Sequence, residues 1–295
     1  SLGDYFKKEQ LAWIFEFLVD GIKLDPHRLF VTVFAGNADV PRDAKSVEIW
    51  KALFSSKKIE AKDIDQSNIK GMQGGRIFYY SEQKNWWSRS GIPSAMPPGE
   101  PGGPDSEVFY DFGPELYQHE NSQWKNEPCH VNCDCGRFME IGNSVFMQYQ
   151  KQSDGTFKEL PQKNVDFGGG LERLYAAHTH TIDIFTTPFF SSCIKKIEDL
   201  SHKAYDLENG KFKRNFRIIA DHIRAAVMLT SDGVRPSNKE QGYMLRRLIR
   251  RAIRHGRLLG IESLFMADVA QPCIDQYTEI YPNVGEFATD IKSAL

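Results

Sequence analysis

Hydrophobic and polar residues in the first part of the chain predict helices and strands in mixed order. Apolar residues recur three or four positions apart between Leu11 and Val19, which predicts an amphipathic helix that ends before Pro26. Residues 28–35 (RLFVTVFA) are rich in β-branched and aromatic residues, which is typical of a buried strand. A second helix is expected over residues 39–53.

The pattern changes further along the chain. Residues 91–104 contain five prolines and four glycines, so they are expected to form a loop and neither a helix nor a central strand. Strands are predicted at 108–112 and 138–150, the second interrupted at Gly142. Residues 164–177 begin extended, cross three glycines and enter a helix near Leu171.

Everything after Pro188 has the pattern of helices. An α+β fold is therefore predicted: a mostly antiparallel sheet with flanking helices over residues 1–190, then an all-α domain over residues 191–295. A length of 295 residues with 41% hydrophobic content fits two domains. Charged residues near the N-terminus and the lack of a long apolar run predict a soluble, cytoplasmic protein with no membrane partner.

Charge is distributed unevenly along the chain. The net charge is −2, yet residues 211–257 hold 13 lysines and arginines against 3 acidic residues. A basic segment on an otherwise acidic chain is typical of a protein that binds a polyanion. The alternative is a solvated helix face, which is the commoner origin of charge runs.

The most basic part of this segment is a predicted helix after Ser237. Ser237 and Glu240, three positions apart, have the pattern of a capping box at its start. Apolar residues between Leu245 and Ile253 form one stripe, and arginines three or four positions apart occupy another face. Such a row of guanidinium groups suits a phosphate backbone. The arginines of this row are Arg247, Arg250, Arg254 and Arg257.

A glycine-rich segment, residues 165–173 (VDFGGGLER), is the strongest candidate for chemistry. Adjacent glycines let the backbone approach a ligand, and the start of the following helix favours anions. Arg173 suits a phosphate and Asp166 suits an ammonium group. Taken alone, the glycines also fit a flexible turn before an ordinary helix.

A cysteine-rich segment precedes the strand at 138–150. Cys129, His130, Cys133 and Cys135 offer four nitrogen or sulfur ligands, the set that tetrahedral Zn²⁺ takes. Their spacing is tighter than in standard zinc fingers. The alternative is a group of reduced structural thiols, in keeping with an odd total of five cysteines.

The glycine-rich segment resembles motif 3 of class II aminoacyl-tRNA synthetases, and the chain as a whole resembles the alanyl-tRNA synthetase family. The matching segments occur in the family's order and cover essentially the whole chain. They are residues 3–7 (GDYFK, the end of motif 2), 85–87 (NWW), 107–111 (EVFYD), 140–148 (EIGNSVFMQ), 217–224 (RIIADHIR), 231–238 (SDGVRPSN) and 242–251 (GYMLRRLIRR).

The resemblance implies a class II sheet and an alanine pocket with Asp166 on the α-amino group. Trp87 and Val145 would limit the space around the methyl group. The implied pocket residues are Trp87, Asn143, Val145, Asp166 and Gly168.

The resemblance also implies ATP and Mg²⁺. Arg173 would hold the ATP phosphates and Gly170 would allow their close approach, while Glu107 or Asp111 would bind Mg²⁺. For these two acids, the alternative is a pairing role within strands. The basic helix would bind the acceptor stem of tRNA(Ala), with Asn238 reading a base pair.

Departures from the family pattern qualify these expectations. Motif 1 and the first strand of motif 2 are expected to be missing, which leaves the sheet and the ATP site incomplete. The family's editing motif is absent, and the loop at 99–105 lacks the family's cysteines. Alternative functions are a non-catalytic acceptor-stem-binding paralogue or fragment, and a ligase or adenylating enzyme for a different amine or carrier.

Overall fold

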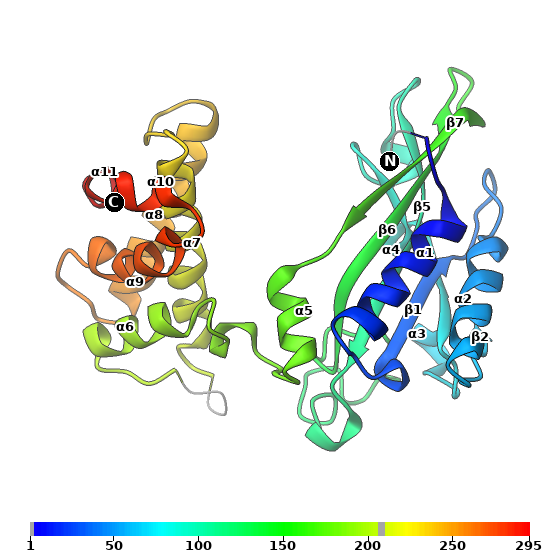
Figure 1. Ribbon diagram of the computed structural model, residues 1–295, viewed down its shortest axis with the longest axis horizontal. Helices are drawn as coiled ribbons and strands as arrows, with labels where there is room; N and C mark the ends of the chain where they lie inside the picture. Colours follow the sequence, from blue (N-terminus) through cyan, green and yellow to red (C-terminus); the bar gives the residue numbers. More distant parts are fainter. Residues whose placement is uncertain (1–2, 206–209) are drawn as a thin grey trace. The chain divides into compact units, whose positions relative to one another are not determined.

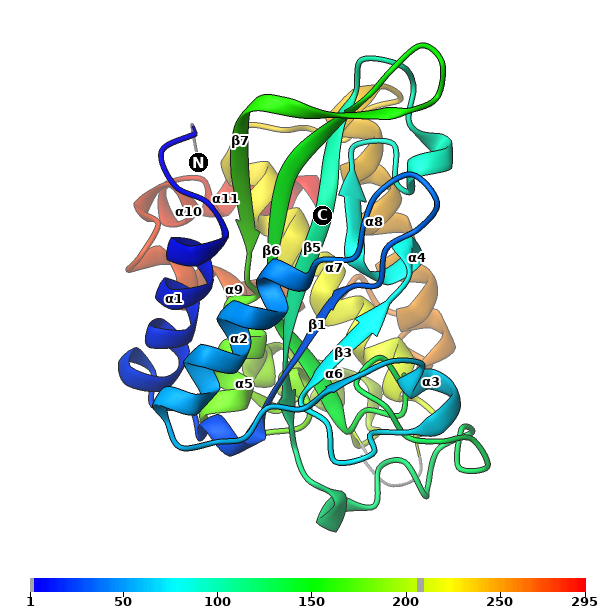
Figure 2. The same ribbon diagram turned by 90° about the vertical axis from the view of Figure 1, so that its right-hand side faces the viewer.

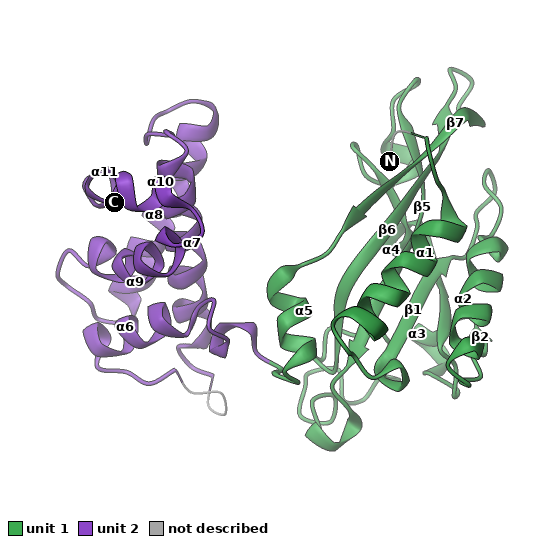
Figure 3. Ribbon diagram, viewed as in Figure 1, with its two compact units in different colours: residues 1–182 green, residues 183–295 purple. Residues whose placement is uncertain are grey.

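The computed structural model describes residues 3–205 and 210–295 and divides into two compact units. One unit spans residues 1–182 and the other residues 183–295 (Figure 3). Each unit has a hydrophobic core of its own. The first unit contains the sheet, and the second consists of helices (Figure 1).

Within the described residues, seven strands of the first unit form one sheet in the order β2-β3-β1-β5-β6-β7, with β4 paired to β5. β1 and β2 each run parallel to β3, and the remaining pairs are antiparallel. The mostly antiparallel α+β fold is thus confirmed. The strands are β1 Leu29–Phe34, β2 Asp63–Ile64, β3 Ile77–Tyr80, β4 Trp86–Ser88, β5 Pro101–Asp111, β6 Phe138–Lys151 and β7 Phe157–Gly168.

Helices α1 and α2 lie against one face of this sheet (Figure 2). Their apolar faces supply Leu11, Phe15, Trp50 and Phe54 to the core. The helix expected at 39–53 begins later because the Asp43 carboxylate caps it by accepting the Ser46 amide at 3.1 Å. The helices of this unit are α1 Lys7–Glu16, α2 Ala44–Ser56, α3 Ser67–Lys70, α4 Glu82–Asn85 and α5 Leu171–His178.

Alternation along β5 separates the two faces of the sheet. Val108 and Tyr110 belong to the core under α1 and α2. Asp105 and Glu107 alternate with them and therefore lie on the opposite face. That opposite face carries the polar residues described below.

The expectation that residues 91–104 form only a loop is wrong at its end, because β5 begins at Pro101. Gly102 and Gly103 pair with Ser88 and Trp87 of β4. The strand tolerates these residues because its register against β6 shifts between Gly102 and Asp105. A Cβ on Gly103 would lie only 1.9 Å from the Phe146 carbonyl oxygen, so only glycine allows this approach. At Gly142, β6 continues where an interruption was expected, although the pairing shifts there.

The helical unit is built around a pair of long helices, α7 and α8. Apolar residues of α8, among them Leu245, Ile249 and Ala252, are buried with Ile219 and Ile223 of α7. The predicted apolar stripe therefore forms. The helices are α6 Ser191–Ser201, α7 Lys213–Ser231, α8 Glu240–Leu258, α9 Met266–Thr278, α10 Pro282–Glu286 and α11 Ala288–Ala294. Among the described helices, none combines the length and apolar character needed to cross a membrane.

The predicted capping box at the start of α8 is wrong. The Ser237 hydroxyl donates to the Lys239 carbonyl at 3.0 Å and accepts the Lys239 amide at 3.3 Å. The Ser237 hydroxyl therefore makes its hydrogen bonds within its own turn and does not cap the helix. The helix begins only at Glu240, with Lys239 at the capping position.

Candidate functional site

The polar face of the sheet carries two rows of residues that cross β5, β6 and β7. In one row Val145 lies between Asp105 and Asp166. Directly paired residues of neighbouring strands project from the same face, so these side chains are neighbours. The second row is Glu107, Asn143 and Gly168.

Four of the five residues expected to form the alanine pocket therefore lie together. Val145 is buried, whereas Asp166 and Gly168 are exposed at the edge of the same patch. Trp87 reaches this sheet through β4, opposite Gly103, and is 41% exposed. The patch combines an exposed carboxylate, a buried apolar residue and an open glycine backbone.

A hydrogen-bond network lies beneath this patch. The Asn85 amide donates to Asp105 at 3.0 Å and to the Thr32 hydroxyl at 2.8 Å, and Thr32 donates to Glu107 at 2.9 Å. Asn143 donates to Asp105 at 3.3 Å. The side-chain oxygens of Asn85 and Asn143 are buried without a partner. These two acceptor atoms therefore lack a donor from the protein.

Both acids of the network hold their protons more tightly than usual. Burial raises the pKa of Asp105 to about 7, against the hydrogen bonds from Asn85 and Asn143. Burial, together with the neighbouring charges of Asp105 and Glu140, raises the pKa of Glu107 to about 8. A cation entering the patch would stabilise their ionised forms.

Glu107 and Asp111, the two residues expected to bind Mg²⁺, differ in their partners. Arg137 donates to both carboxylate oxygens of Asp111, at 2.8 and 2.7 Å, and the Gly113 amide donates to one of them at 2.8 Å. Asp111 thus has the pairing role that was expected as the alternative to Mg²⁺ binding. Glu107 accepts from Thr32 and lies in the second row.

Arg173 lies in the first turn of α5, directly after the glycines. Its guanidinium donates to the Glu140 carbonyl oxygen at 3.0 Å and to the Glu140 carboxylate at 3.2 Å, and its side chain is 48% exposed. A Cβ on Gly170 would lie 3.3 Å from the Arg173 side chain. The glycine leaves room for the arginine, which presents its exposed part to an incoming anion.

Asn85, Thr32 and Asp105 belong to this site but were not expected there from the sequence. Asn85 lies in residues 85–87, which resemble the family, but no role was expected for it. Asp105 lies two residues before Glu107. That two-residue spacing within a strand is the signal that would have found Asp105. Thr32 lies in an apolar strand and gave no signal of its own.

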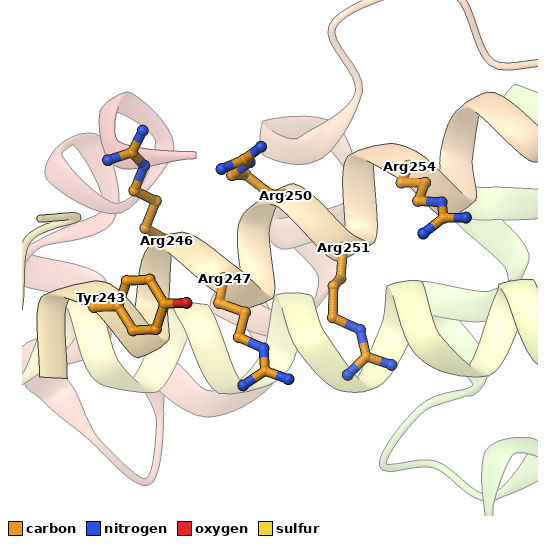
Figure 4. Close-up of a pocket in the computed structure, with 6 residues that line it drawn as sticks. All are labelled: Tyr243, Arg246, Arg247, Arg250, Arg251 and Arg254. Carbon is orange, nitrogen blue, oxygen red and sulfur yellow. The ribbon is translucent and has the colours of Figure 1, made fainter. Parts of the chain in front are cut away.

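The helical unit carries a separate polar surface made of arginines on α8. Arg247 and Arg251 extend side by side, whereas Arg246 and Arg250 point to the other side of the helix (Figure 4). These residues are exposed. Together with Tyr243 and Arg254 they line an open hollow with a volume of about 430 Å³. The surface is suited to a polyanion because exposed arginines line one open hollow.

Arg257 and Asn238 have partners that the sequence did not indicate. The Arg257 guanidinium donates to the Ile261 carbonyl at 3.0 Å, in the turn that follows α8, and does not line the hollow. The Asn238 oxygen accepts a hydrogen bond from Arg246. Of the expected row, Arg247, Arg250 and Arg254 thus line the hollow. Arg246 and Arg251, which were not expected, line it as well.

The cysteine-rich segment brings together a set different from the expected one. His130 Nδ1 lies 2.8 Å from the Tyr80 hydroxyl oxygen. In place of His130, His119 joins Cys133 and Cys135, with their ligand atoms within 4.8 Å of one another. The thiol of Cys129 hydrogen-bonds Cys135 and lowers the pKa of Cys135 to about 5. His119 lies ten residues before Cys129 and therefore outside residues 129–135, where the ligands were expected.

Comparison with known proteins places this arrangement in a family. The family described as tRNA synthetases class II (A) matches residues 1–295. The alanine–tRNA ligase of Treponema denticola is 41% identical over 96% of this chain, and that of Treponema pallidum 39% over all of it. The alanine–tRNA ligase of Acetivibrio thermocellus is 35% identical over the whole chain.

These relatives are longer than the chain. The matched region makes up 43% and 44% of the two Treponema proteins and 29% of the Acetivibrio protein. The match is continuous through both compact units, from the sheet to the helices. The chain therefore belongs to the class II tRNA synthetases, in the family designated tRNA synthetases class II (A).

Proposed function

We propose that the protein containing this chain is an alanine–tRNA ligase, which activates alanine with ATP and transfers it to tRNA(Ala). The observation that carries the proposal is the pair of cross-strand rows. They bring Asn143, Val145, Asp166 and Gly168 onto one patch of the sheet. The names of the relatives supply the amino acid and the acceptor.

In this proposal Asp166 binds the α-ammonium group of alanine. Its carboxylate is exposed at the patch and directly opposite Val145. Val145 and Trp87 limit the space for the methyl group, and the partnerless Asn143 oxygen accepts a hydrogen bond from the substrate. Asp105 and Glu107, beneath the patch, hold their protons more tightly than usual, and the ammonium group of bound alanine stabilises their ionised forms.

ATP fits the residues that follow the glycines. Arg173 is half exposed at the start of α5, where the helix dipole also favours a phosphate. For Mg²⁺, Glu107 fits better than Asp111, whose oxygens are taken by Arg137 and Gly113. When bound, Mg²⁺ would neutralise phosphate charge. Attack of the alanine carboxylate on the α-phosphate then depends mainly on positioning and charge neutralisation by these residues.

Binding of the tRNA acceptor stem is assigned to the arginines of α8. Arg247, Arg250 and Arg254 contact phosphates, and Asn238 contacts a base edge once Arg246 releases it. All four arginines of the expected row are exposed, as such a contact requires, although the Arg257 guanidinium also donates to the Ile261 carbonyl. A cytoplasmic location stays a prediction.

The test is ATP–pyrophosphate exchange by the full-length protein with each amino acid in turn. Alanine is expected to support the fastest exchange. Glycine and serine are expected to follow, since one methylene group discriminates by only about 1–3 kcal/mol. Faster exchange with an unrelated amino acid would reassign the substrate. No exchange, together with retained tRNA binding, would favour the non-catalytic acceptor-stem-binding alternative.

A further inference from the structure

The segment between β5 and β6 is long and buries few side chains. From Pro114 to Arg137 it contains a single 3-10 turn, Pro114–Leu116, and otherwise only turns and bends. The buried residues in this range are His119, Val131, Cys133 and Cys135. A single valine cannot organise a segment of this length by apolar burial. The remaining three buried residues are all of types that bind metals.

These three residues converge on one point. Their ligand atoms lie within 4.8 Å of one another, and Cys133 Sγ is 3.6 Å from His119 Nδ1. In a tetrahedral site with Zn–S near 2.3 Å and Zn–N near 2.0 Å, a sulfur and a nitrogen ligand are about 3.6 Å apart. The observed separation therefore leaves a position for one metal ion between them.

The hydrogen bond of His119 Nε2 determines which ring nitrogen carries the free lone pair. His119 Nε2 lies 3.0 Å from the Glu127 carbonyl oxygen, which can only accept. Nε2 therefore carries the hydrogen, and in the neutral ring Nδ1 presents a lone pair toward Cys133. This hydrogen bond to a backbone carbonyl is the outer contact that metal-binding histidines usually make.

Cys129 is the candidate fourth ligand, although it lies outside the group of three whose ligand atoms are within 4.8 Å of one another. It is half-buried, and its thiol hydrogen-bonds Cys135. Its sulfur therefore lies beside that of Cys135, one member of the group of three. His130 does not, because its Nδ1 lies beside the Tyr80 hydroxyl. Three sulfurs and one imidazole nitrogen form a complete tetrahedral donor set.

We propose that His119, Cys129, Cys133 and Cys135 form a structural Zn²⁺ site that organises the segment between β5 and β6. Thiolate and imidazole ligands select zinc over magnesium or calcium, which take oxygen ligands. Zinc binding releases the thiol protons to solvent and involves no change of oxidation state. All four positions are filled by protein ligands, so the site is structural and not catalytic.

The proposed site is connected to the sheet. Arg137 follows Cys135 by two residues, and its guanidinium holds Asp111 at the end of β5 through two hydrogen bonds of 2.8 and 2.7 Å. Zinc would thus hold the segment at the point where it joins both strands. This role is independent of alanine, ATP and tRNA.

Two substitutions within the segment test the ligand set. The chain is purified without added zinc and its metal content measured by elemental analysis. The parent and His130→Gln are expected to hold one equivalent of zinc, whereas His119→Gln lowers the zinc affinity more than about tenfold. Loss of zinc in His130→Gln, or its retention in His119→Gln, would overturn the assignment of His119.

A second measurement needs no variant and so does not depend on folding of a mutant. The parent chain is stripped of metal and titrated with Co²⁺, a spectroscopic substitute for zinc. Tetrahedral visible bands and thiolate-to-cobalt charge-transfer absorption are expected, saturating at one equivalent. Absence of these bands, together with a parent chain that takes up no zinc on reconstitution, would leave only a cluster of reduced thiols.

Discussion

The two compact units build their polar surfaces in opposite ways. In the sheet unit, acids from different strands are gathered by cross-strand pairing, as for Asp105, Glu107 and Asp166. In the helical unit, arginines of one helix are gathered by its own periodicity. The first surface is partly buried and acidic, whereas the second is exposed and basic.

This difference corresponds to the size and charge of the proposed ligands. The ammonium group of a small substrate is recognised by a few carboxylates that lose their water when the substrate binds, each of which contributes strongly. A nucleic acid is recognised by many solvated contacts, each of which releases about one counterion. Substitutions on the sheet should therefore act singly and strongly, and substitutions on α8 should act cumulatively and depend on salt.

The largest effect is expected from Asp166→Asn in the full-length protein. Removing the charge opposite the alanine ammonium should cost on the order of 2–4 kcal/mol, or roughly 30- to 1,000-fold in kcat/KM for alanine. Alanine-dependent pyrophosphate exchange measures it. Asp154→Asn, an equal charge change in the exposed turn between β6 and β7, is the control and should behave as the parent. An unchanged alanine KM and kcat in Asp166→Asn would remove this residue from the pocket.

The second effect concerns the arginine surface. Arg250→Gln combined with Arg254→Gln should weaken tRNA binding roughly ten- to hundredfold at low salt. It should also lower the slope of log K against log salt by about 1–2. Filter binding at several salt concentrations measures both quantities.

Arg257→Gln is the matched control for this surface, because the Arg257 guanidinium donates to the Ile261 carbonyl and does not line the hollow. Its salt slope should equal that of the parent, whereas Arg254→Gln alone should lower the slope by about 1. If the double variant binds tRNA with the parent affinity and salt slope, the α8 arginines form only a solvated face.

The third effect is a pH dependence of stability. Because burial raises the pKa of Asp105 to about 7, its protonated form stabilises the fold at low pH. That contribution is complete below the unfolded pKa, near 4, and is lost as the pH rises through about 7. Asp105→Asn should therefore be more stable than the parent by about 1–3 kcal/mol near pH 8, with the difference shrinking toward about pH 5.

Urea unfolding at several pH values measures this difference. Asparagine keeps the Asn85 hydrogen bond through its oxygen, and its N–H reaches the Asn143 oxygen once the Asn143 amide, which now donates to Asp105, turns over. Asp39→Asn, at an exposed position, is the control and should follow the parent curve. A pH-independent difference between Asp105→Asn and the parent would contradict the raised pKa.

The smallest effect is expected from Asn238→Ala. If Asn238 reads a base edge, discrimination between matched and mismatched acceptor stems should fall by about 1–2 kcal/mol with little change in salt slope. Binding competition between the two RNAs measures it, with Gln241→Ala in the next turn as control. A change in slope without loss of discrimination would assign Asn238 to positioning Arg246, which it contacts.

The arginine surface was more predictable from sequence than the acidic patch. Spacing alone places the backbone positions of Arg247, Arg250 and Arg254 on one face of a helix, because helical neighbours are fixed by local geometry, although the Arg247 and Arg250 side chains diverge (Figure 4). The engagement of Arg257 by Ile261 was missed, since a carbonyl in the following turn leaves no sequence pattern. The same applies to the Ser237 hydroxyl, which binds within its own turn.

The acidic patch on the sheet was less predictable from the sequence. The strands of the sheet were predicted, but the partners within it depend on register between segments far apart in sequence. Asn85, Thr32 and Asp105 meet only because α4, β1 and β5 are adjacent. The exchange of His130 for His119 among the clustered thiols has the same cause. The expected pocket residues came from the resemblance to a family, and only the structure showed their neighbours.

In the proposed division of roles, activation belongs to the acidic patch and tRNA binding to the arginines of α8. The most direct test is tRNA-free ATP–pyrophosphate exchange with alanine, run on the full-length protein that carries Arg250→Gln and Arg254→Gln. We expect kcat and the alanine KM to stay at parent values while tRNA binding is weakened. A fall in exchange that parallels the loss of tRNA binding would contradict this division of roles.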